Sequence, residues 1–340
     1  MADSVNQSLA NNKMVADMLQ FPRRTFLLGC LFATIAPAVA SAASSSTRLI
    51  LLGTQGGPNF SLKRGETASM LVINDQPYLI DCGYGTLRAL LESGVNYLNI
   101  GHVFLTHLHD DHNADLPALL GHQWTQGRIK PTRVFGPYGT DKLVQAVNLY
   151  NQANTEIRMV DEARSLQPKA MFAGTVVKAG AEPVAVLRNG DVTITAIENA
   201  HYPTEAKAKI PHRSLAYRFD TADRSIVFSG DTAYSDNLVK LAHGADVLVC
   251  EAIEKEVYRT IYDKRVANGA YADNPEGVWK HIIGTHSSTE DAGRMAAAAG
   301  VKTLVLNHII PGDIDDSVFI ASARKAFGGE IVVGKDQMVL

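Results

Sequence analysis

The segment FLTHLHDDHNADLPALL, residues 104–120, places three histidines and two aspartates in six positions directly after an apolar run. Side chains on a strand repeat every two residues, so His107 and His109 are expected to point the same way. Asp111 and His112 then fall on the turn into the following helix. Imidazole and carboxylate groups are both ligands of Zn²⁺. The pattern H-x-H-x-D-H after a buried strand therefore predicts a metal site in place of a solvated loop.

Three further ionisable residues follow apolar strands elsewhere in the chain. His201 comes after VTITAIENA, Asp231 after SIVFSG and His308 after KTLVLN. A single histidine at a strand end is usually structural, but three recurrences beside the first motif favour ligands of one site. An aspartate between two metal ions can bind both, and water shared by such ions has a pKa near neutrality. These residues therefore predict a metal centre built from several strand ends.

The order of strand-like and helix-like segments predicts an α/β fold. Apolar runs typical of strands alternate with amphipathic segments from residue 48 to the C-terminus. The runs 68–74 and 77–81 are joined through Asn74-Asp75, which is typical of an antiparallel hairpin. We expect two sheets packed face to face with helices outside, a four-layer αβ/βα sandwich, and the hairpin argues against a plain doubly wound sheet. Residues 102–107 are expected to form a buried strand that ends at His107, and residues 255–285 to be helical at first and then irregular. Residues 152–190 are the least regular part and are predicted to form a protruding arm or cap.

Residues 1–42 are predicted to be a signal peptide of the twin-arginine type. Arg23 and Arg24 precede an apolar run over residues 26–36, and small residues at 40–42 fit a cleavage site. The apolar run is short for a bilayer span, which needs about 20 residues. The mature chain is therefore expected in the periplasm or secreted, with no membrane span.

Charge and cysteine content restrict the range of functions. The formal net charge of the 340 residues is −3, so nothing indicates broad electrostatic capture of nucleic acid or of an anionic membrane. Outside the signal segment the sequence holds Cys82 and Cys250, each in an apolar run. Neither has the spacing of a zinc-binding pair, and buried free thiols are favoured over a disulfide between them.

Taken in order, the strand-end residues resemble the metal-binding set of the metallo-β-lactamase superfamily, over residues 49–311. The resemblance implies a metallo-β-lactamase fold for residues 43–340 and a binuclear zinc hydrolase. By that correspondence one Zn²⁺ is held by His107, His109 and His201. The other is held by Asp111, His112 and His308, with Asp231 as a bridge. Asp81, in LIDCG, resembles the aspartate of the superfamily's first motif, which supports the site without binding metal.

Two segments resemble the ribonuclease Z branch, which processes the 3′ ends of tRNA, and its relatives the zinc arylsulfatases. They are LLGTQGGPNFSLKRGETASMLV at residues 51–72 and THSSTEDAGRMAAAAGVKTLVLNHIIPG at residues 285–312. The resemblance implies that His286 donates a proton to the leaving group or to a non-bridging ester oxygen, near the metals but not on them. The alternative is a histidine in the N-cap region of the helix that begins near Thr289.

Several departures from the ribonuclease branch favour a small ester over RNA as the substrate. Cys250-Glu251-Ala252-Ile253 stands where that branch usually has His-Glu-Ala-Thr. Residues 252–285 form a longer connection than expected for the branch, and no Gly- and Lys-rich arm for tRNA is evident. Residues 152–190 hold nearly balanced charges, unlike a surface that follows a phosphate backbone. An exported enzyme would also meet no tRNA precursor.

We therefore expect a hydrolase of phosphate or sulfate esters, similar to phosphodiesterases and arylsulfatases, in which a hydroxide shared by two Zn²⁺ ions attacks the ester. Asp111 is expected to orient this hydroxide, and His286 to assist the leaving group. The expected partner is a small-molecule ester, with no nucleic acid, and a homodimer is left open. The alternatives are a lactonase or β-lactamase, a tRNA 3′-processing endonuclease and a non-catalytic zinc-binding protein. Further candidates to line a pocket are His212, His281, Trp124, Tyr202 and Trp279.

Overall fold

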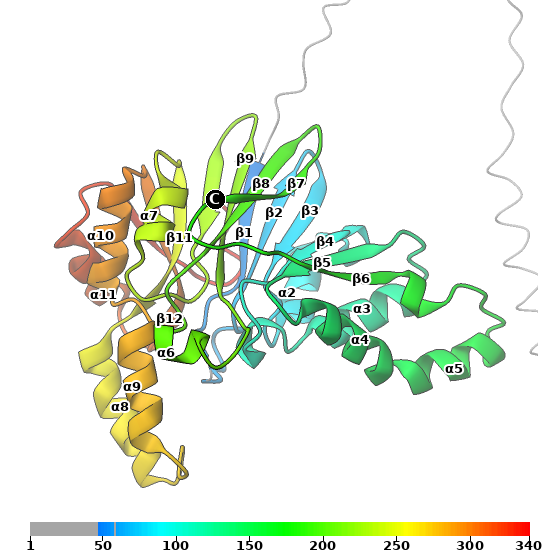
Figure 1. Ribbon diagram of the computed structural model, residues 1–340, viewed down its shortest axis with the longest axis horizontal. Coiled ribbons are helices and arrows are strands. Elements are labelled where there is room, and N and C mark those ends of the chain that lie inside the picture. The colour runs from blue at the N-terminus through cyan, green and yellow to red at the C-terminus, as the bar shows by residue number, and fades with distance from the viewer. Residues whose placement is uncertain (1–46, 58) are drawn as a thin grey trace, which may run out of the picture. The chain divides into compact units, whose positions relative to one another are not determined.

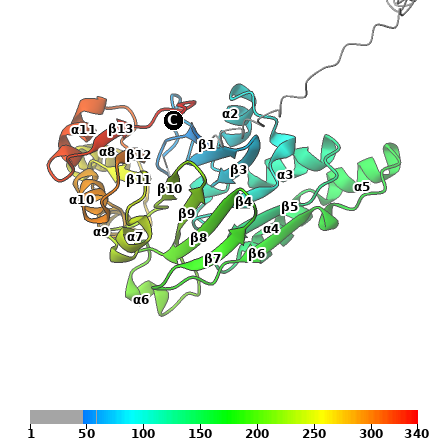
Figure 2. The ribbon, with the colours of Figure 1, turned by 90° about the horizontal axis from the view of Figure 1, so that it is seen from above.

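Two β-sheets packed face to face form the centre of the fold, and helices cover the outer face of each sheet (Figure 1 and Figure 2). The computed structural model describes residues 47–57 and 59–340. The first sheet has the order β1-β2-β3-β4-β5-β6, with antiparallel pairing from β1 to β3 and parallel pairing from β3 to β6. Its strands are β1 (Thr47–Gly53), β2 (Ala68–Ile73), β3 (Gln76–Ile80), β4 (His102–Phe104), β5 (Thr132–Gly136) and β6 (Phe172–Val176).

The second sheet has the order β13-β12-β11-β10-β9-β8-β7. Neighbouring strands run parallel from β10 to β13 and antiparallel from β10 to β7. Its strands are β7 (Val184–Arg188), β8 (Val192–Glu198), β9 (Leu215–Thr221), β10 (Ser225–Phe228), β11 (Val247–Ile253), β12 (Thr303–Ile310) and β13 (Glu330–Val333). Two mixed sheets with helices outside confirm the predicted four-layer αβ/βα sandwich.

Two groups of helices form the outer layers. The first sheet is covered by α2 (Thr86–Glu92), α3 (Leu116–Thr125) and α4 (Thr140–Tyr150). The second sheet is covered by α7 (Asp236–Ala242), α10 (Thr289–Ala299) and α11 (Asp316–Arg324). The short helix α6 (Thr204–Lys207) follows β8, and single 3₁₀ turns lie at Tyr97–Asn99, Asp110–His112 and Pro168–Ala170.

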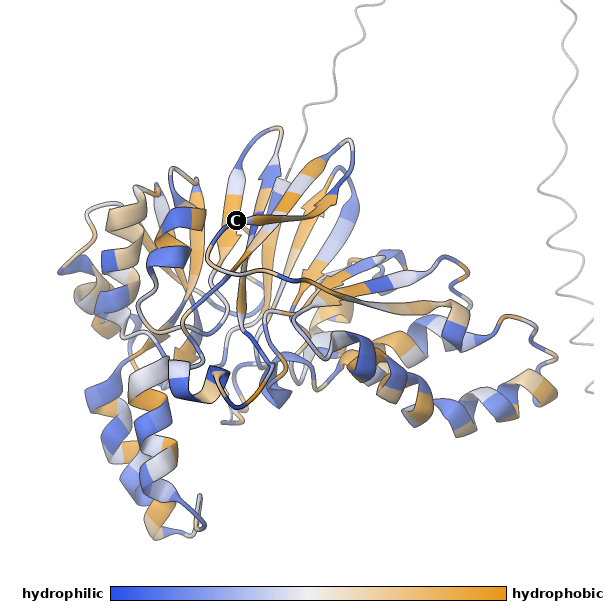
Figure 3. Cartoon of the chain, in the orientation of Figure 1, coloured by the Kyte–Doolittle hydropathy of each residue, from blue (hydrophilic) through white to orange (hydrophobic). Residues whose placement is uncertain are grey.

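Apolar side chains fill the spaces between the layers. Between the two sheets, Phe104 of β4 packs edge-to-face against Tyr217 and Phe219 of β9. Figure 3 shows that the strands are mostly apolar, whereas the outer helices carry both apolar and polar residues. Burial of this apolar area is the main stabilising contribution to such a core. Cys82 lies in the core under the first helical layer and Cys250 in the core under the second, and both are buried free thiols, as predicted.

The β2–β3 hairpin confirms the turn predicted at Asn74-Asp75. Ile73 and Gln76 are the last paired residues, so the loop has two residues. Both loop residues adopt the left-handed conformation, with φ of 48° at Asn74 and 63° at Asp75. A two-residue loop with both φ values positive matches the right-handed twist of the flanking strands.

Residues 152–190, for which the sequence predicts an arm or cap, hold one helix and two edge strands. Helix α5 (Gln152–Asp161) extends from the end of α4 (Figure 1). Strand β6 is one edge strand of the first sheet, and β7 is one edge strand of the second. The predicted signal peptide lies outside the described residues. In the part of the chain that the structure describes, no helix has the length and apolarity that crossing a bilayer requires.

The connection after β11 differs from the sequence-based expectation, because its second half is a regular helix. Helices α8 (Lys255–Ala267) and α9 (Pro275–Thr285) form an antiparallel pair that projects from the sandwich (Figure 1). Asn274 caps α9, since its side chain accepts a hydrogen bond from the Gly277 N–H, and Pro275 occupies the first turn. Both features are established helix-start signals, and they explain why the segment is helical and not irregular.

We predict that Asp75→Gly raises the free energy of unfolding by about 1 kcal/mol, because glycine adopts a positive φ without the steric penalty that other residues carry. Urea unfolding followed by circular dichroism measures this change. The matched variant Asp75→Ala should lower the stability, since alanine tolerates a positive φ less well than aspartate. Equal stability of the three proteins would contradict the role assigned to this turn.

Candidate metal centre and active site

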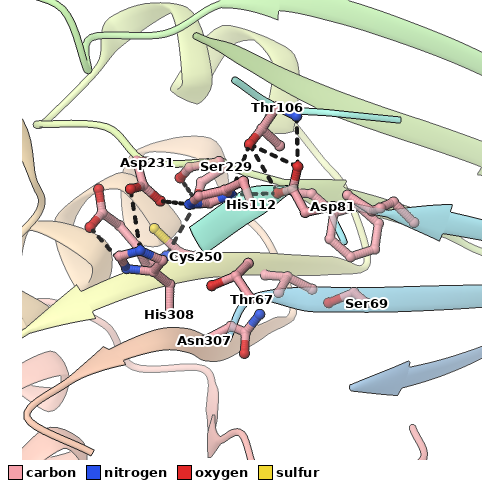
Figure 4. A pocket seen from close by; sticks show the side chains of 15 residues that line it. Thr67, Ser69, Asp81, Thr106, His112, Ser229, Asp231, Cys250, Asn307 and His308 are labelled. Carbon is pink, nitrogen blue, oxygen red and sulfur yellow. Dashed lines mark hydrogen bonds and ion pairs between the residues drawn. The ribbon is translucent and has the colours of Figure 1, made fainter. Parts of the chain in front are cut away.

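The Asp81 carboxylate holds the segment that follows β4 by hydrogen bonds. The strand ends at Phe104, three residues before the predicted end at His107. The Thr106 N–H and hydroxyl donate to the two carboxylate oxygens of Asp81, at 2.8 and 2.9 Å. The same carboxylate accepts from His112 Nδ1 at 2.9 Å (Figure 4). Asp81 thereby fixes the His112 tautomer and directs Nε2 into the site, which is the supporting geometry expected of a residue behind a metal ligand.

His107, His109 and His201 form the first ligand group, with one potential donor atom of each within 4.8 Å of the others. The Thr285 carbonyl oxygen lies 3.1 Å from His201 Nδ1 and accepts its proton, which leaves His201 Nε2 facing His109 Nδ1 at 3.3 Å. Burial lowers the pKa of all three imidazoles, and that of His107 and His201 by a large amount. These rings are therefore neutral, as metal ligands must be.

Asp111, His112, Asp231 and His308 form the second ligand group. Asp231 Oδ1 lies 3.2 Å from His112 Nε2, and Asp231 Oδ2 lies 3.2 Å from His308 Nε2 (Figure 4). Asp111 Oδ2 is 3.3 Å from the same nitrogen of His308. Asp231 Oδ2 also lies 3.8 Å from His107 Nε2, a member of the first group. The Asp231 carboxylate therefore stands between the two groups.

A β-bulge aims His308 into the site. Glu251 pairs with Asn307 and Ala252 with Ile309, so His308 is an extra residue in β12. Its φ is 45°, in the left-handed region that residues other than glycine seldom adopt. Bulges commonly redirect a side chain next to a functional site, and this one turns His308 toward Asp231.

The seven side chains fit Zn²⁺. His107 Nε2 is completely buried and has no hydrogen-bond partner among the described residues. A buried acceptor without a partner is costly, and a cation would satisfy it. Imidazole nitrogens and carboxylate oxygens are the ligands that Zn²⁺ takes in hydrolases. The structure therefore brings all seven predicted ligands together in two adjoining groups that could hold metal.

Electrostatics differ between the two groups. Burial lowers the pKa of His308, but Asp231 and Asp111 outweigh burial and raise it to about 9. The pKa of His112 is also raised, because Asp231, Asp111 and Asp81 surround a ring that burial alone would keep neutral. Burial raises the pKa of Asp231, yet His308 and His112 hold it well below its usual value. Without metal, the second group is therefore a network of carboxylates and imidazolium ions.

Glu251 is a site residue that the sequence analysis did not assign. Its Oε2 lies 2.8 Å from His286 Nδ1, and its Oε1 accepts from the Thr232 N–H. Burial lowers the pKa of His286, but the Glu251 carboxylate raises it overall above the usual value. Ser288, and not His286, caps α10, so the alternative explanation for the histidine is not needed. The signal for Glu251 lies in the Cys-Glu-Ala-Ile segment, whose glutamate matches the usual motif although two of its neighbours differ.

A pocket opens between the two ligand groups and the α8–α9 pair, and we call it the central pocket. Its lining includes Gly57, His109, Asp111, Tyr258, His281 and His286. The Gly57 N–H donates to Asp111 Oδ2 at 3.0 Å, and a Cβ at this position would lie 2.2 Å from that oxygen. Only glycine therefore allows the backbone to approach the carboxylate so closely. The glycine-rich turn after β1 carried this signal.

The other pocket candidates lie in different places. The Tyr202 hydroxyl is 3.5 Å from His109 Nε2, beside the first ligand group. His281 lines the central pocket, and burial together with His286 and His109 lowers its pKa to about 4. Trp124 lies in the core under the first helical layer, and Trp279 packs against Tyr262 in the α8–α9 pair. His212 packs against Tyr138 instead of facing the ligand groups.

Comparison with known families agrees with this site. The profile of the β-lactamase superfamily domain matches residues 77–309. The chain belongs to the metallo-β-lactamase superfamily. Among curated proteins, ribonuclease Z of Mycobacterium bovis (strain BCG / Pasteur 1173P2) is 32% identical over 293 residues, which cover 85% of this chain and 95% of that protein. Ribonuclease Z of Mycobacterium marinum is 31% identical over 298 residues, with coverage of 85% and 96%.

Solved structures of the superfamily show the same fold. The metallo-β-lactamase fold protein YhfI from Bacillus subtilis aligns with a TM-score of 0.60 at 20% identity, covering 86% of this chain and 98% of that one. The short form of human tRNase Z aligns with a TM-score of 0.59 at 22% identity, over 86% and 98%. This superfamily member is therefore a hydrolase whose curated homologues include ribonucleases.

The expectation of no nucleic-acid partner is wrong, because relatives that match over nearly their full length are ribonucleases. The expectation gave weight to a net charge of −3, which averages over the whole chain. Recognition of a phosphodiester needs only local positive charge, and bound metal ions supply it without changing the side-chain balance. Net charge is therefore a poor guide to the substrate of a metal-dependent nuclease.

We predict that Zn²⁺ uptake by the metal-free protein near neutral pH releases about two protons per chain. His308, with a pKa of about 9, and His112 must lose a proton to become ligands, whereas His107 and His201 are already neutral. Calorimetric titration of chelator-stripped protein in buffers of different ionisation enthalpy counts the protons. The count should fall when the pH rises above the pKa of His308. His308→Ala should release about one proton fewer, and a count of zero in the parent would contradict the protonation of the second ligand group.

Proposed function

We propose that this chain is a zinc-dependent phosphodiesterase that cleaves tRNA precursors at their 3′ end. One observation carries the proposal. The Glu251–His286 pair stands beside two adjoining ligand groups in a chain that is 32% identical to a ribonuclease Z along 95% of that protein. A metal cluster supports hydrolysis in general, whereas a carboxylate-supported imidazole beside it supports protonation of a poor leaving group such as an alkoxide.

The two ligand groups would hold two Zn²⁺ ions, with Asp231 shared between them. His107, His109 and His201 would bind one ion, and Asp111, His112 and His308 the other. Zn²⁺ in such a site polarises phosphoryl oxygens and lowers the pKa of bound water. Asp81 would keep His112 in the tautomer that presents Nε2, and the Thr285 carbonyl would do the same for His201.

Residues around the ions would orient water and move the proton. Asp111 is held by the Gly57 N–H and would orient the attacking water. Glu251 Oε2 accepts the Nδ1 proton of His286, so the second proton of the imidazolium, on Nε2, is free to pass to the leaving oxygen. Because Glu251 raises the pKa of His286 above its usual value, it favours the protonated ring that can act as an acid. The leaving oxygen thereby departs as a hydroxyl group and not as an alkoxide.

A second candidate is a hydrolase of a small phosphate or sulfate ester. The observation that favours it is the wall of the central pocket opposite the ligands, where α8 and α9 present Tyr258, Val278 and Ile282. Such a wall suits the organic group of a small ester as well as a nucleotide base. The two candidates differ in how much of the substrate lies outside the pocket, and direct competition between substrates separates them.

We predict that the zinc-loaded protein cleaves a tRNA precursor with a kcat/KM at least about 100-fold above that for bis(4-nitrophenyl) phosphate, because contacts to the rest of the RNA contribute to transition-state binding. Measurement on 4-nitrophenyl sulfate, a lactone and a cephalosporin completes the comparison. Asp231→Ala should lose activity on every substrate and bind less zinc. Cleavage of the sulfate or the small diester with no cleavage of the precursor would favour the second candidate.

We predict that His286→Ala retains zinc but loses about 10²–10⁴-fold in turnover, the usual contribution of a general acid. In Glu251→Gln the carboxylate that raises the pKa of His286 is removed, so that pKa falls. Activity requires the protonated ring and is lost as the pH rises through this pKa. The basic limb of the pH–rate profile should therefore move to lower pH in Glu251→Gln. An unmoved limb, with turnover in His286→Ala equal to that of the parent, would contradict this role.

A further inference from the structure

The α8–α9 pair brings one additional histidine into the central pocket. His281, on α9, lines the pocket together with His109 and His286. Its ring centroid is 5.4 Å from that of His286, with the ring planes at 87°, and 6.0 Å from that of His109. His281 offers a ligand atom within 4.8 Å of those of His201 and His286. It belongs to neither of the two groups assigned above to the ions, and the mechanism above gives it no role. The segment that carries it, residues 252–285, is also the connection that is longer than expected from the resemblance to the ribonuclease branch.

Hydrogen bonds at the end of α9 determine which nitrogen of His281 carries the proton. The Thr285 hydroxyl donates to the His281 carbonyl oxygen at 2.8 Å, as threonine often does one turn along a helix. Thr285 Oγ1 also lies 3.1 Å from His281 Nδ1. Since the hydroxyl has a single proton, the second contact must be donated by His281 Nδ1–H. In a neutral imidazole this leaves Nε2 as a hydrogen-bond acceptor.

The α8–α9 pair holds this histidine in a fixed place. Lys255, at the start of α8, donates from Nζ to the carbonyl oxygens of Ile283 and His286, at 2.8 and 2.7 Å. Ile282, next to His281, is buried in an apolar cluster with Tyr258 and Ile310. The residues that directly follow His281 are therefore anchored to α8 and to β12, and the acceptor is part of a preformed wall.

An acceptor that lines the central pocket is matched by a hydrogen-bond donor on the substrate. Among the described residues, none donates a hydrogen bond to His281 Nε2. A lone pair facing the non-bridging oxygens of a phosphate would be repelled, so the matching group is a hydroxyl beside the scissile phosphate. In RNA cleaved to leave a 3′-hydroxyl, that group is the 2′-hydroxyl, on the carbon next to the leaving oxygen. The 2′-hydroxyl is also the group that distinguishes RNA from DNA.

We propose that His281 is a specificity-determining residue, which accepts a hydrogen bond from the 2′-hydroxyl of the nucleotide whose 3′-oxygen is protonated by His286. The inference rests on the proposed function and adds to it the feature of RNA that the site reads. The two imidazoles then contact two oxygens on neighbouring carbons of the ribose. His286 gives a proton to the leaving oxygen, and His281 holds its neighbour, so a DNA linkage in the same place leaves the His281 lone pair without a partner.

A thermodynamic cycle between enzyme and substrate tests this inference. Single-turnover rates would be measured for the parent and for His281→Ala, on a tRNA precursor with either 2′-OH or a single 2′-H at the cleaved nucleotide. The 2′-H change also alters the leaving group, but this effect is common to both enzymes and cancels in the cycle. Replacing 2′-OH by 2′-H should lower the single-turnover rate of the parent by a factor about tenfold larger than it lowers the rate of His281→Ala. His281→Gln, whose amide oxygen also accepts, should restore part of this difference.

Controls separate the outcomes. Lys280→Ala changes an exposed side chain on the same turn and should behave as the parent. Zinc content should be unchanged in His281→Ala, because loss of zinc would make the histidine a ligand and overturn the inference. An equal 2′-H penalty in the parent and in His281→Ala, with RNA cleaved by both, would overturn the inference alone. Failure of the zinc-loaded parent to cleave any RNA would overturn the proposed function and this inference with it.

Discussion

The buried carboxylate of Asp231 is the group on which the rest of the site depends. It is 2% exposed, and an ionised carboxylate at that depth costs several kcal/mol unless charged partners compensate. Compensation comes from His112, which follows a strand of the first sheet, and His308, which lies in a strand of the second. One carboxylate therefore requires the ends of both sheets to meet, so the packing of the sandwich and the assembly of the ligand groups are the same structural requirement.

The ligands could be predicted because they follow strands, whereas the contacts that orient them could not. Ionisable residues at the ends of apolar runs stand out in one dimension, and parallel strands bring those ends to one edge. The bulge at His308 and the two carboxylate bonds from Thr106 depend on how separate strands meet, which no local pattern contains. The short β4 has the same cause, since Asp81 takes the Thr106 N–H that a longer strand would have paired.

The features that sequence reasoning misses do have signals in the sequence, but neighbouring residues obscure them. Asn274-Pro275 is a strong helix-start signal, yet it lies in the half of residues 255–285 for which the sequence analysis expects irregular structure. Glu251 lies in a recognised motif whose neighbours differ, and the differences drew attention from the residue that forms the bond to His286. The expectation of no nucleic-acid partner is wrong for a related reason, because the net charge describes the whole chain and not the site.

The placement of the α8–α9 pair has a consequence for how such a site can change over evolution. The pair lies between Glu251 and His286 in the chain, while the hydrogen bond between these residues closes the segment as a loop. The entropic cost of closing a loop grows only with the logarithm of its length, by about 0.6 kcal/mol for each doubling. Insertion at this point therefore leaves the hydrogen bond between Glu251 and His286 almost undisturbed. The connection can be lengthened and refolded as a new wall of the pocket, and the substrate range can shift while the hydrolytic chemistry stays the same.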